Sequence, residues 1–158
     1  MNLLADFTYV LYPAAPPWYV AKYGFLQPLA PVMGDPAGLV RFDALLGVSL
    51  AKGFYGMSPV VFGAIPSMHA GFSGLIFLYS FQLGKKWAVF FGIYFLCMCF
   101  AALYLQHHYG IDLVVGTVYA LIAYLFVEKW AAGAVRRTYG FLEERLVREG
   151  PKPFWGRF

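Results

Sequence analysis

Two short polar segments carry the side chains that could do chemistry in an otherwise apolar chain. The first, "IPSMHAG", contains Ser67 and His69, and the second, "LQHHYGIDLVVG", contains His107, His108 and Asp112. His108 and Asp112 are four residues apart, so on a helix they would share one face within hydrogen-bonding reach. A carboxylate on one imidazole nitrogen fixes the tautomer and raises the basicity of the other nitrogen. The spacing therefore predicts a nucleophilic histidine.

The first segment supplies groups that such a nucleophile needs. Ser67 stands where a helix N-cap is expected, and the free N–H groups of a helix N-terminus can bind an anionic phosphate. His69, in the first turn, can pass a proton to or from an oxygen on phosphorus. His107 is adjacent to His108 and points elsewhere on a helix, so we interpret it as a substrate contact or a residue that supports the site from behind, rather than as a nucleophile.

Residues outside these segments are weaker candidates. Arg41, in "GLVRFDALLG", is either a phosphate clamp or the surface ion-pair partner of Asp43. Trp18 and Tyr55 could line a headgroup pocket. Taken singly, an interfacial histidine is commonly a polar anchor and a Ser-Pro pair a cap. Two histidines and a carboxylate at one membrane depth, however, cost enough free energy to make a site the default hypothesis.

Composition places these residues in a membrane. The chain has 158 residues, 61% hydrophobic and only 13% charged, which excludes an ordinary soluble domain. Residues 68–83, 87–105 and 111–130 are apolar runs close to the about 20 residues that cross a bilayer. We expect helices, because a lone strand could not satisfy its backbone in lipid. The prediction is an all-α polytopic bundle, packed closely through small residues: Gly71, Ser73, Gly74, Gly110 and Gly116.

The remaining segments divide the chain further. The amino terminus resembles the tail of a spanning helix broken by Pro13, Pro16 and Pro17, and it lacks the charged region and cleavage site of a signal peptide. Residues 22–59 predict a re-entrant or interfacial segment with a short amphipathic piece around residues 39–50. We therefore expect a membrane-embedded catalytic core at residues 1–130 and a basic cytoplasmic tail at residues 131–158.

Charge distribution predicts the orientation. Lys85 and Lys86 join the first two spans, and the basic tail leaves on the same side, which marks that side as cytoplasmic. The segment "QHHYG" joins the other two ends. The candidate site would then face away from the cytoplasm. Although basic tails can bind nucleic acid, nothing else in the sequence supports such a partner.

The polar segments resemble motifs of the type 2 phosphatidic acid phosphatase superfamily. Pro66, Ser67 and His69 match its Pro-Ser-x-His motif, and His108 with Asp112 matches its His-x-x-x-Asp motif. The sequence is more similar to the inositol phosphorylceramide synthase branch, through "YPAAPPW", "GDPAGLVRFDALLG", "SPVVFGAIPSMHAG" and "HHYGIDLVVG". The Ser-Arg pair and the Lys-x6-Arg-Pro motif of the phosphatases are absent, and the synthases also lack that arginine of the pair.

The resemblance implies a membrane phosphotransferase that moves an inositol-phosphate-like headgroup from a phospholipid to a ceramide-like lipid hydroxyl. His108 would form a phosphohistidine, His69 would act as acid and base, and Asp112 would hold His108, with no metal or cofactor. The family core has six helices, so further amino-terminal helices or another subunit would complete it. Hydrolysis with water as acceptor and a noncatalytic membrane subunit remain alternatives.

A metal site formed by the three histidines and Asp112 is a further rival, because imidazole and carboxylate suit zinc. We rank it lower, since adjacent histidines do not share a helix face.

Overall fold

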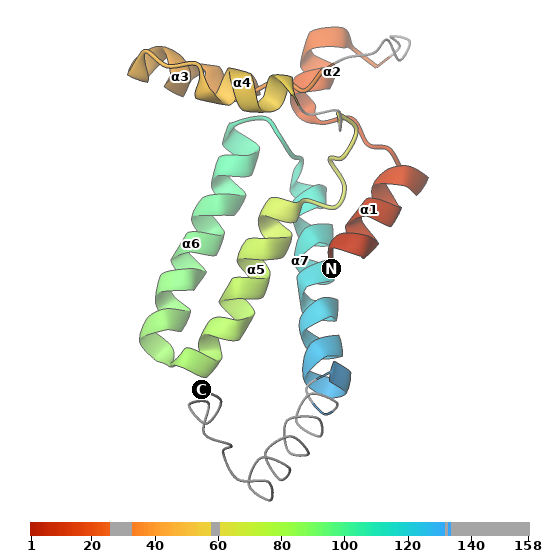
Figure 1. The fold of residues 1–158 in the computed structure, drawn as a ribbon, viewed down its shortest axis with the longest axis vertical. Coiled ribbons are helices and arrows are strands. Elements are labelled where there is room, and N and C mark those ends of the chain that lie inside the picture. Colours follow the sequence, from red (N-terminus) through yellow and green to blue (C-terminus); the bar gives the residue numbers. More distant parts are fainter. Residues whose placement is uncertain (26–32, 58–60, 132, 134–158) are drawn as a thin grey trace, which may run out of the picture. The chain divides into compact units, whose positions relative to one another are not determined.

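The computed structural model describes residues 1–25, 33–57, 61–131 and 133, and these residues form helices joined by short loops (Figure 1). Most of the predicted basic tail, residues 134–158, lies outside the described residues. Met1–Ala123 and Tyr124–Phe158 are two compact units, and the site described below lies within the first. The boundary at residue 130 stays a prediction. The elements in order are α1 (Asn2–Leu11), α2 (Pro17–Tyr23), η1 (Ala37–Leu39), α3 (Val40–Leu46), α4 (Leu50–Gly56), α5 (Met68–Ser80), η2 (Phe81–Leu83), α6 (Lys85–Tyr104), α7 (Gly110–Phe126) and η3 (Val127–Ala131).

Two of the three predicted spans reach full length. Among the described residues, Lys85–Tyr104 and Gly110–Trp130 are 20 and 21 residues long, each with a mean hydropathy of 2.0. The α5 helix has 13 residues and continues as a 3-10 turn to Leu83, which together span about 25 Å, short of the about 30 Å hydrocarbon core. The prediction of a third full-length span was therefore wrong in length, although a helix does form there.

The start of α5 follows from its sequence. Ser67 is the N-cap, and its Oγ accepts a long hydrogen bond of 3.5 Å from the N–H of Ala70. The other end closes at Gly84, whose φ of 106° lies in a region that favours glycine, and α6 begins at the next residue. The predicted cap at Ser67 is confirmed.

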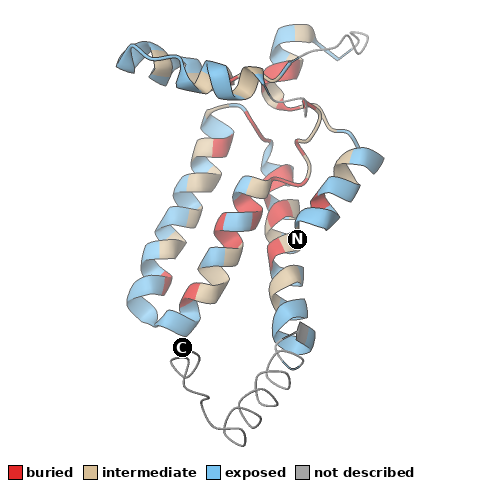
Figure 2. Ribbon diagram, viewed as in Figure 1, coloured by how far each residue is buried: buried red, intermediate tan, exposed pale blue. Residues whose placement is uncertain are grey.

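Small residues bring α5 and α7 together, as the sequence predicted. A Cβ built on Gly71 would lie 3.5 Å from the carbonyl oxygen of Gly116, and one on Gly74 would lie 3.5 Å from the Cβ of Ala120. Gly116 faces the main chain of Ser67 so closely that a Cβ there would overlap the Ser67 carbonyl oxygen. Buried residues gather along these facing surfaces (Figure 2). The polar start of α5 is therefore fixed against α7.

The segment before α5 is also tied to the amino terminus. Ala14 follows the break after α1 and forms an isolated bridge with Gly63, through bonds of 2.8 Å (Ala14 N to Phe62 O) and 3.2 Å (Ala64 N to Ala14 O). Pro17 occupies the first turn of α2, where its missing N–H is harmless. The α3 and α4 helices cross the end of the α5–α7 bundle and are mostly exposed (Figures 1 and 2). They occupy the segment predicted to be interfacial.

Candidate active site

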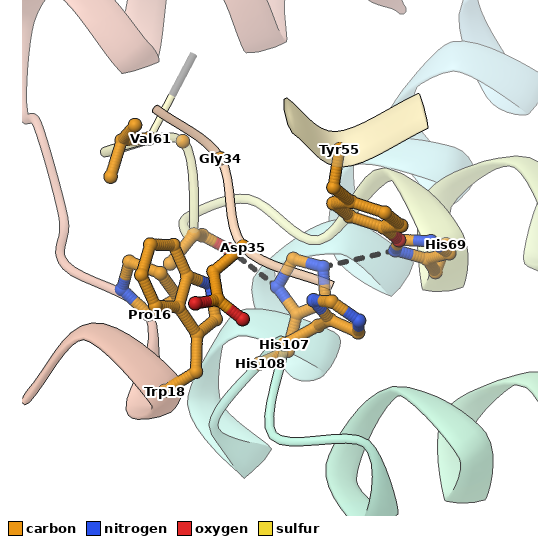
Figure 3. A pocket seen from close by; sticks show the side chains of 11 residues that line it. Pro16, Trp18, Gly34, Asp35, Tyr55, Val61, His69, His107 and His108 are labelled. Atoms are coloured by element: carbon orange, nitrogen blue, oxygen red, sulfur yellow. Dashed lines mark hydrogen bonds between the residues drawn. The ribbon is translucent and has the colours of Figure 1, made fainter. Parts of the chain in front are cut away.

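His108 lies in the loop between α6 and α7, two residues before the first residue of α7, Gly110. The expected shared helix face with Asp112 is therefore wrong, because the histidine precedes the helix. Its Nδ1 nevertheless lies 3.5 Å from Oδ2 of Asp112. A closer partner is the carbonyl oxygen of Ala64, 2.9 Å from Nδ1 (Figure 3). The main chain before α5, rather than the carboxylate alone, holds the ring.

This contact determines the tautomer of His108. A carbonyl oxygen can only accept, so Nδ1 carries the proton and the neutral ring keeps a lone pair on Nε2. Burial, followed by the nearby His69, lowers the pKa of His108 to about 4, so the ring is neutral near pH 7. His108 therefore presents an unprotonated Nε2, which is the form that a nucleophile requires.

His69 faces that lone pair from the first turn of α5. Its Nδ1 lies 3.0 Å from Nε2 of His108, and the ring centroids are 5.1 Å apart at 66° (Figure 3). Because Nε2 of His108 accepts, Nδ1 of His69 must donate. The structure thus brings the two predicted catalytic histidines together, with a proton on the nitrogen of His69 that points to the nucleophile.

Asp112 is fully buried in the first turn of α7. Its Oδ2 accepts a 2.7 Å bond from the N–H of Tyr109, as a capping-box acid does for the residue before its helix. Its Oδ1 has no hydrogen-bond partner among the described residues. The main chain of Asp112 also accepts a 3.0 Å bond from the N–H of Ser67. Asp112 therefore joins the starts of α5 and α7, besides placing negative charge near His108.

The histidines open onto a cavity of about 160 Å³ that has several polar side chains in its lining. His69, His107 and His108 line it together with Trp18, Asp35 and Tyr55 (Figure 3). The rings of Tyr55 and His107 stack, with centroids 4.8 Å apart at 14°. Burial, followed by His69, lowers the pKa of His107 to about 4, so this ring is also neutral near pH 7. The expectation that Trp18 and Tyr55 lie near the site is confirmed.

A second hollow meets the site at His69. It is an apolar groove of about 360 Å³ between α5 and α6. Its lining consists of Met68, His69, Phe72, Ser73, Ile76, Tyr94 and Met98. His69 thus lies between a cavity lined partly by polar side chains and an apolar groove, an arrangement that suits a molecule with both kinds of surface.

Two predicted binding residues do not line either hollow. The side chain of Ser67 is fully buried and caps α5, so only neighbouring main-chain groups could meet a substrate. Arg41 is exposed on α3 and lies outside the cavity lining. The carboxylate of Asp43 accepts bonds of 3.1 and 3.0 Å from the N–H groups of Ala51 and Lys52, and no ion pair with Arg41 occurs among the described residues. In the described residues, Arg41 therefore contacts neither the cavity, as a phosphate clamp would, nor Asp43, as an ion-pair partner would.

The sequence profile of the PAP2 superfamily matches residues 1–126. The chain belongs to the PAP2 superfamily. This is an enzyme family of membrane proteins, and the apolar helices agree with an integral membrane location. The all-helical bundle expected for a PAP2 protein is confirmed in the described part of the chain.

The chain is similar in sequence to curated proteins that are synthases. It is 40% identical over 129 residues to the inositol phosphorylceramide synthase catalytic subunit of Schizosaccharomyces pombe, covering 82% of this chain and 31% of the relative. It is 39% identical over 131 residues to the phosphoinositol dihydroceramide synthase of Bacteroides thetaiotaomicron, covering 81% and 42%. The chain thus spans less than half of the length of these relatives. No solved structure is a significant match.

Sequence reasoning missed two parts of this PAP2 site. The Ala64 carbonyl left no signal, because any residue type carries a main-chain acceptor. The ion pair of Lys22 and Asp35, with 2.8 Å between Nζ and Oδ2, joins residues that are 13 positions apart within the predicted interfacial segment, a separation that no helix or strand spacing relates. Asp35 is the acidic residue of the segment "GDP", which precedes the predicted amphipathic piece, and its position there was the only hint of a role in the site. Within the described residues, no group of three or more His, Cys, Asp or Glu could hold a metal ion. The metal-free scheme stays a prediction.

Proposed function

We propose that this chain carries the catalytic pair of a membrane phosphotransferase that moves an inositol-phosphate-like headgroup from a phospholipid to a lipid hydroxyl. The observation that carries the proposal is the 3.0 Å contact between Nδ1 of His69 and Nε2 of His108, placed where a cavity lined partly by polar side chains meets an apolar groove. The names of the relatives, which are synthases of inositol phosphorylceramide or phosphoinositol dihydroceramide, support the choice of substrates.

In the first step, Nε2 of His108 attacks the phosphorus of the donor, and the bond from phosphorus to the diacylglycerol oxygen breaks. His69, protonated on both ring nitrogens at the start of this step, gives the proton on Nδ1 to that oxygen, because a lipid alkoxide is too basic to leave unaided. The His108 ring becomes positively charged as it forms the phosphohistidine. The Ala64 carbonyl and the Asp112 carboxylate, 2.9 and 3.5 Å from Nδ1, stabilise that charge.

In the second step, the hydroxyl of the acceptor lipid attacks the same phosphorus, and the bond to Nε2 of His108 breaks. His69, now neutral, takes the hydroxyl proton, so both histidines return to their starting states. Because His69 also lines the groove between α5 and α6, a lipid chain in that groove would place its polar end at the proton donor and acceptor. We assign both the leaving and the entering lipid oxygen to the side of His69.

Product analysis tests the proposal. The membrane-embedded protein is given an inositol phospholipid labelled on phosphorus, with and without ceramide. Label in a ceramide product and an acid-labile label on the protein that is absent in His108→Ala are expected. Release of free inositol phosphate regardless of ceramide would instead indicate a hydrolase. No labelled product or protein would favour a noncatalytic subunit.

The side of the membrane is tested separately. We propose that the site faces away from the cytoplasm, because Lys85 and Lys86 begin α6 at the end opposite to the histidine loop. In a background without Cys97 and Cys99, a cysteine at Gln106 should react with an impermeant thiol reagent added from the non-cytoplasmic side. Reaction from that side only for a cysteine at Lys86 would mean that the topology is inverted.

A further inference from the structure

The cavity has a second polar wall that the two-histidine chemistry leaves unused. It is formed by Trp18, Asp35, Tyr55 and His107, and we name these four residues the headgroup wall. Figure 3 shows Asp35 and His69 on opposite sides of the adjoining His107 and His108. The headgroup wall therefore adjoins the reacting atoms without belonging to the catalytic pair.

His107 shows that the headgroup wall contains a side-chain nitrogen without a hydrogen-bond partner among the described residues. The residue is only 8% exposed, and its Nε2 has no hydrogen-bond partner among the described residues. Stacking on Tyr55 fixes the plane of the ring, so the nitrogen keeps its direction. A buried polar atom left unpaired costs free energy, and because His107 is one of the residues that line the cavity, a ligand hydroxyl bound there could supply the missing bond.

Asp35 supplies the complementary group. Its Oδ1 accepts a 2.8 Å bond from the N–H of Ala37, and its Oδ2 accepts a 2.8 Å bond from Nζ of Lys22. Although burial alone would raise the pKa of Asp35, these bonds lower it overall, so the carboxylate is ionised near pH 7. Two carboxylate oxygens offer about four acceptor positions, so two remain for a ligand.

The charges narrow the choice of ligand. An anionic group beyond the donor phosphate would be repelled by the Asp35 carboxylate. A cationic headgroup would be repelled by Nζ of Lys22, which lies 2.8 Å from Oδ2 of Asp35. A hydroxyl group is neutral and both donates and accepts, so it can bond Asp35 and His107 together. The aromatic faces of Trp18 and Tyr55 present flat apolar surface to the C–H face of a ring.

We propose that the headgroup wall binds the hydroxyl groups of a polyol headgroup, with Asp35 and His107 as the residues that determine specificity. This inference rests on the proposed phosphotransfer at the neighbouring histidines and assigns the part of the donor that lies beyond the phosphate. Asp35 accepts from one hydroxyl, and His107 bonds the next.

The ratio of the kcat/KM values for two donors tests the role of Asp35. An inositol phospholipid is compared with an aryl phosphodiester that has no polyol, and kcat/KM is measured for both. Asp35→Asn keeps the shape but removes the charge, so the ratio in favour of the inositol donor should fall about 10- to 100-fold. Asp43→Asn is the matched control, because Asp43 likewise accepts two hydrogen bonds, both from main-chain N–H groups, but lies outside the cavity lining, and it should leave the ratio unchanged. An unchanged ratio in Asp35→Asn overturns the proposal.

Binding to the solubilised full chain separates this proposal from the phosphotransfer itself. Calorimetry with inositol 1-phosphate and with inorganic phosphate should give tighter binding of the inositol compound. His107→Phe keeps the ring that stacks on Tyr55 but has no nitrogen, so it should lose that preference while its unfolding temperature stays near that of the wild type. Preference without any turnover would support the headgroup wall and reject the phosphotransferase. Turnover without any preference would reject the headgroup wall alone.

Discussion

The two regions that surround the cavity are built in different ways. At the α5–α7 contact, main chain meets main chain: Ser67 donates to the carbonyl of Asp112 at 3.0 Å, and Gly116 leaves no room for a side chain against Ser67. In α3 and α4, by contrast, none of the residues is buried. The catalytic pair thus depends on a close-packed frame, whereas the short helices beside it present apolar side chains outward, as interfacial elements do.

The largest expected effects come from the histidines of the close-packed region. His108→Ala should abolish turnover of every donor, because no covalent intermediate can form. His69→Ala should lower the rate with a lipid donor by about 10²- to 10⁴-fold, yet release an activated aryl group at close to the normal rate, since that group needs no proton. Rates are measured with both donors. Release in His69→Ala can stop after one equivalent, because the second step needs a base.

Equal losses on the two donors in His69→Ala would contradict the acid-base role and make His69 a phosphate-binding or structural residue.

Next in size is the effect of a methyl group at the helix contact. Gly116→Ala places a Cβ in overlap with the Ser67 carbonyl oxygen, so the two main chains must separate. We expect a loss of about 1–3 kcal/mol in the free energy of unfolding, together with lower activity. Gly110→Ala is the control, because a Cβ there meets nothing within 4 Å. Thermal unfolding in detergent compares them, and equal effects of the two changes would refute the special role of the contact.

The pH dependence of the free energy of unfolding tests the two buried histidine rings that line the cavity. The pKa values of His107 and His108 are lowered to about 4 from the usual 6.5, so the unfolded chain binds more protons between those values. The contribution of the two neutral rings to stability is complete above about pH 6.5 and is lost as the pH falls toward 4, with a slope of up to about 1.4 kcal/mol per unit for each ring. His107→Phe should make the slope shallower. An unaltered slope would show that His107 does not titrate in this window.

The smallest effect is expected in the exposed region. Arg41 is exposed and has no contact with the cavity, so Arg41→Ala should change kcat/KM by less than about twofold. A loss of tenfold or more, with Arg41→Lys also impaired, would restore the phosphate clamp that the sequence suggested.

The same division explains what the sequence could predict. The sequence predicted the helices, the Ser67 cap and the glycine contacts, because apolar length, capping and small-residue spacing are local signals. It also predicted the approach of His69 to His108. The 2.9 Å bond from His108 to Ala64 was not, because it joins a loop to a main-chain carbonyl 44 residues away. Asp35 meets Lys22 through a tertiary fold that no spacing rule describes. Arg41 does not line the cavity, and its role as a phosphate clamp stays a prediction, because a motif gives no direction for a side chain on a short helix.

The bond from Ser67 to the main chain of Asp112 also bears on how such a protein could change over time. Both partners are main-chain atoms, so the spacing of the two histidines does not depend on which side chains surround the rest of the cavity. Substitutions on the opposite wall can then alter what is accepted without disturbing the bond-making atoms. We therefore expect a few point changes in the headgroup wall to alter substrate preference while the contact between the two histidines is kept.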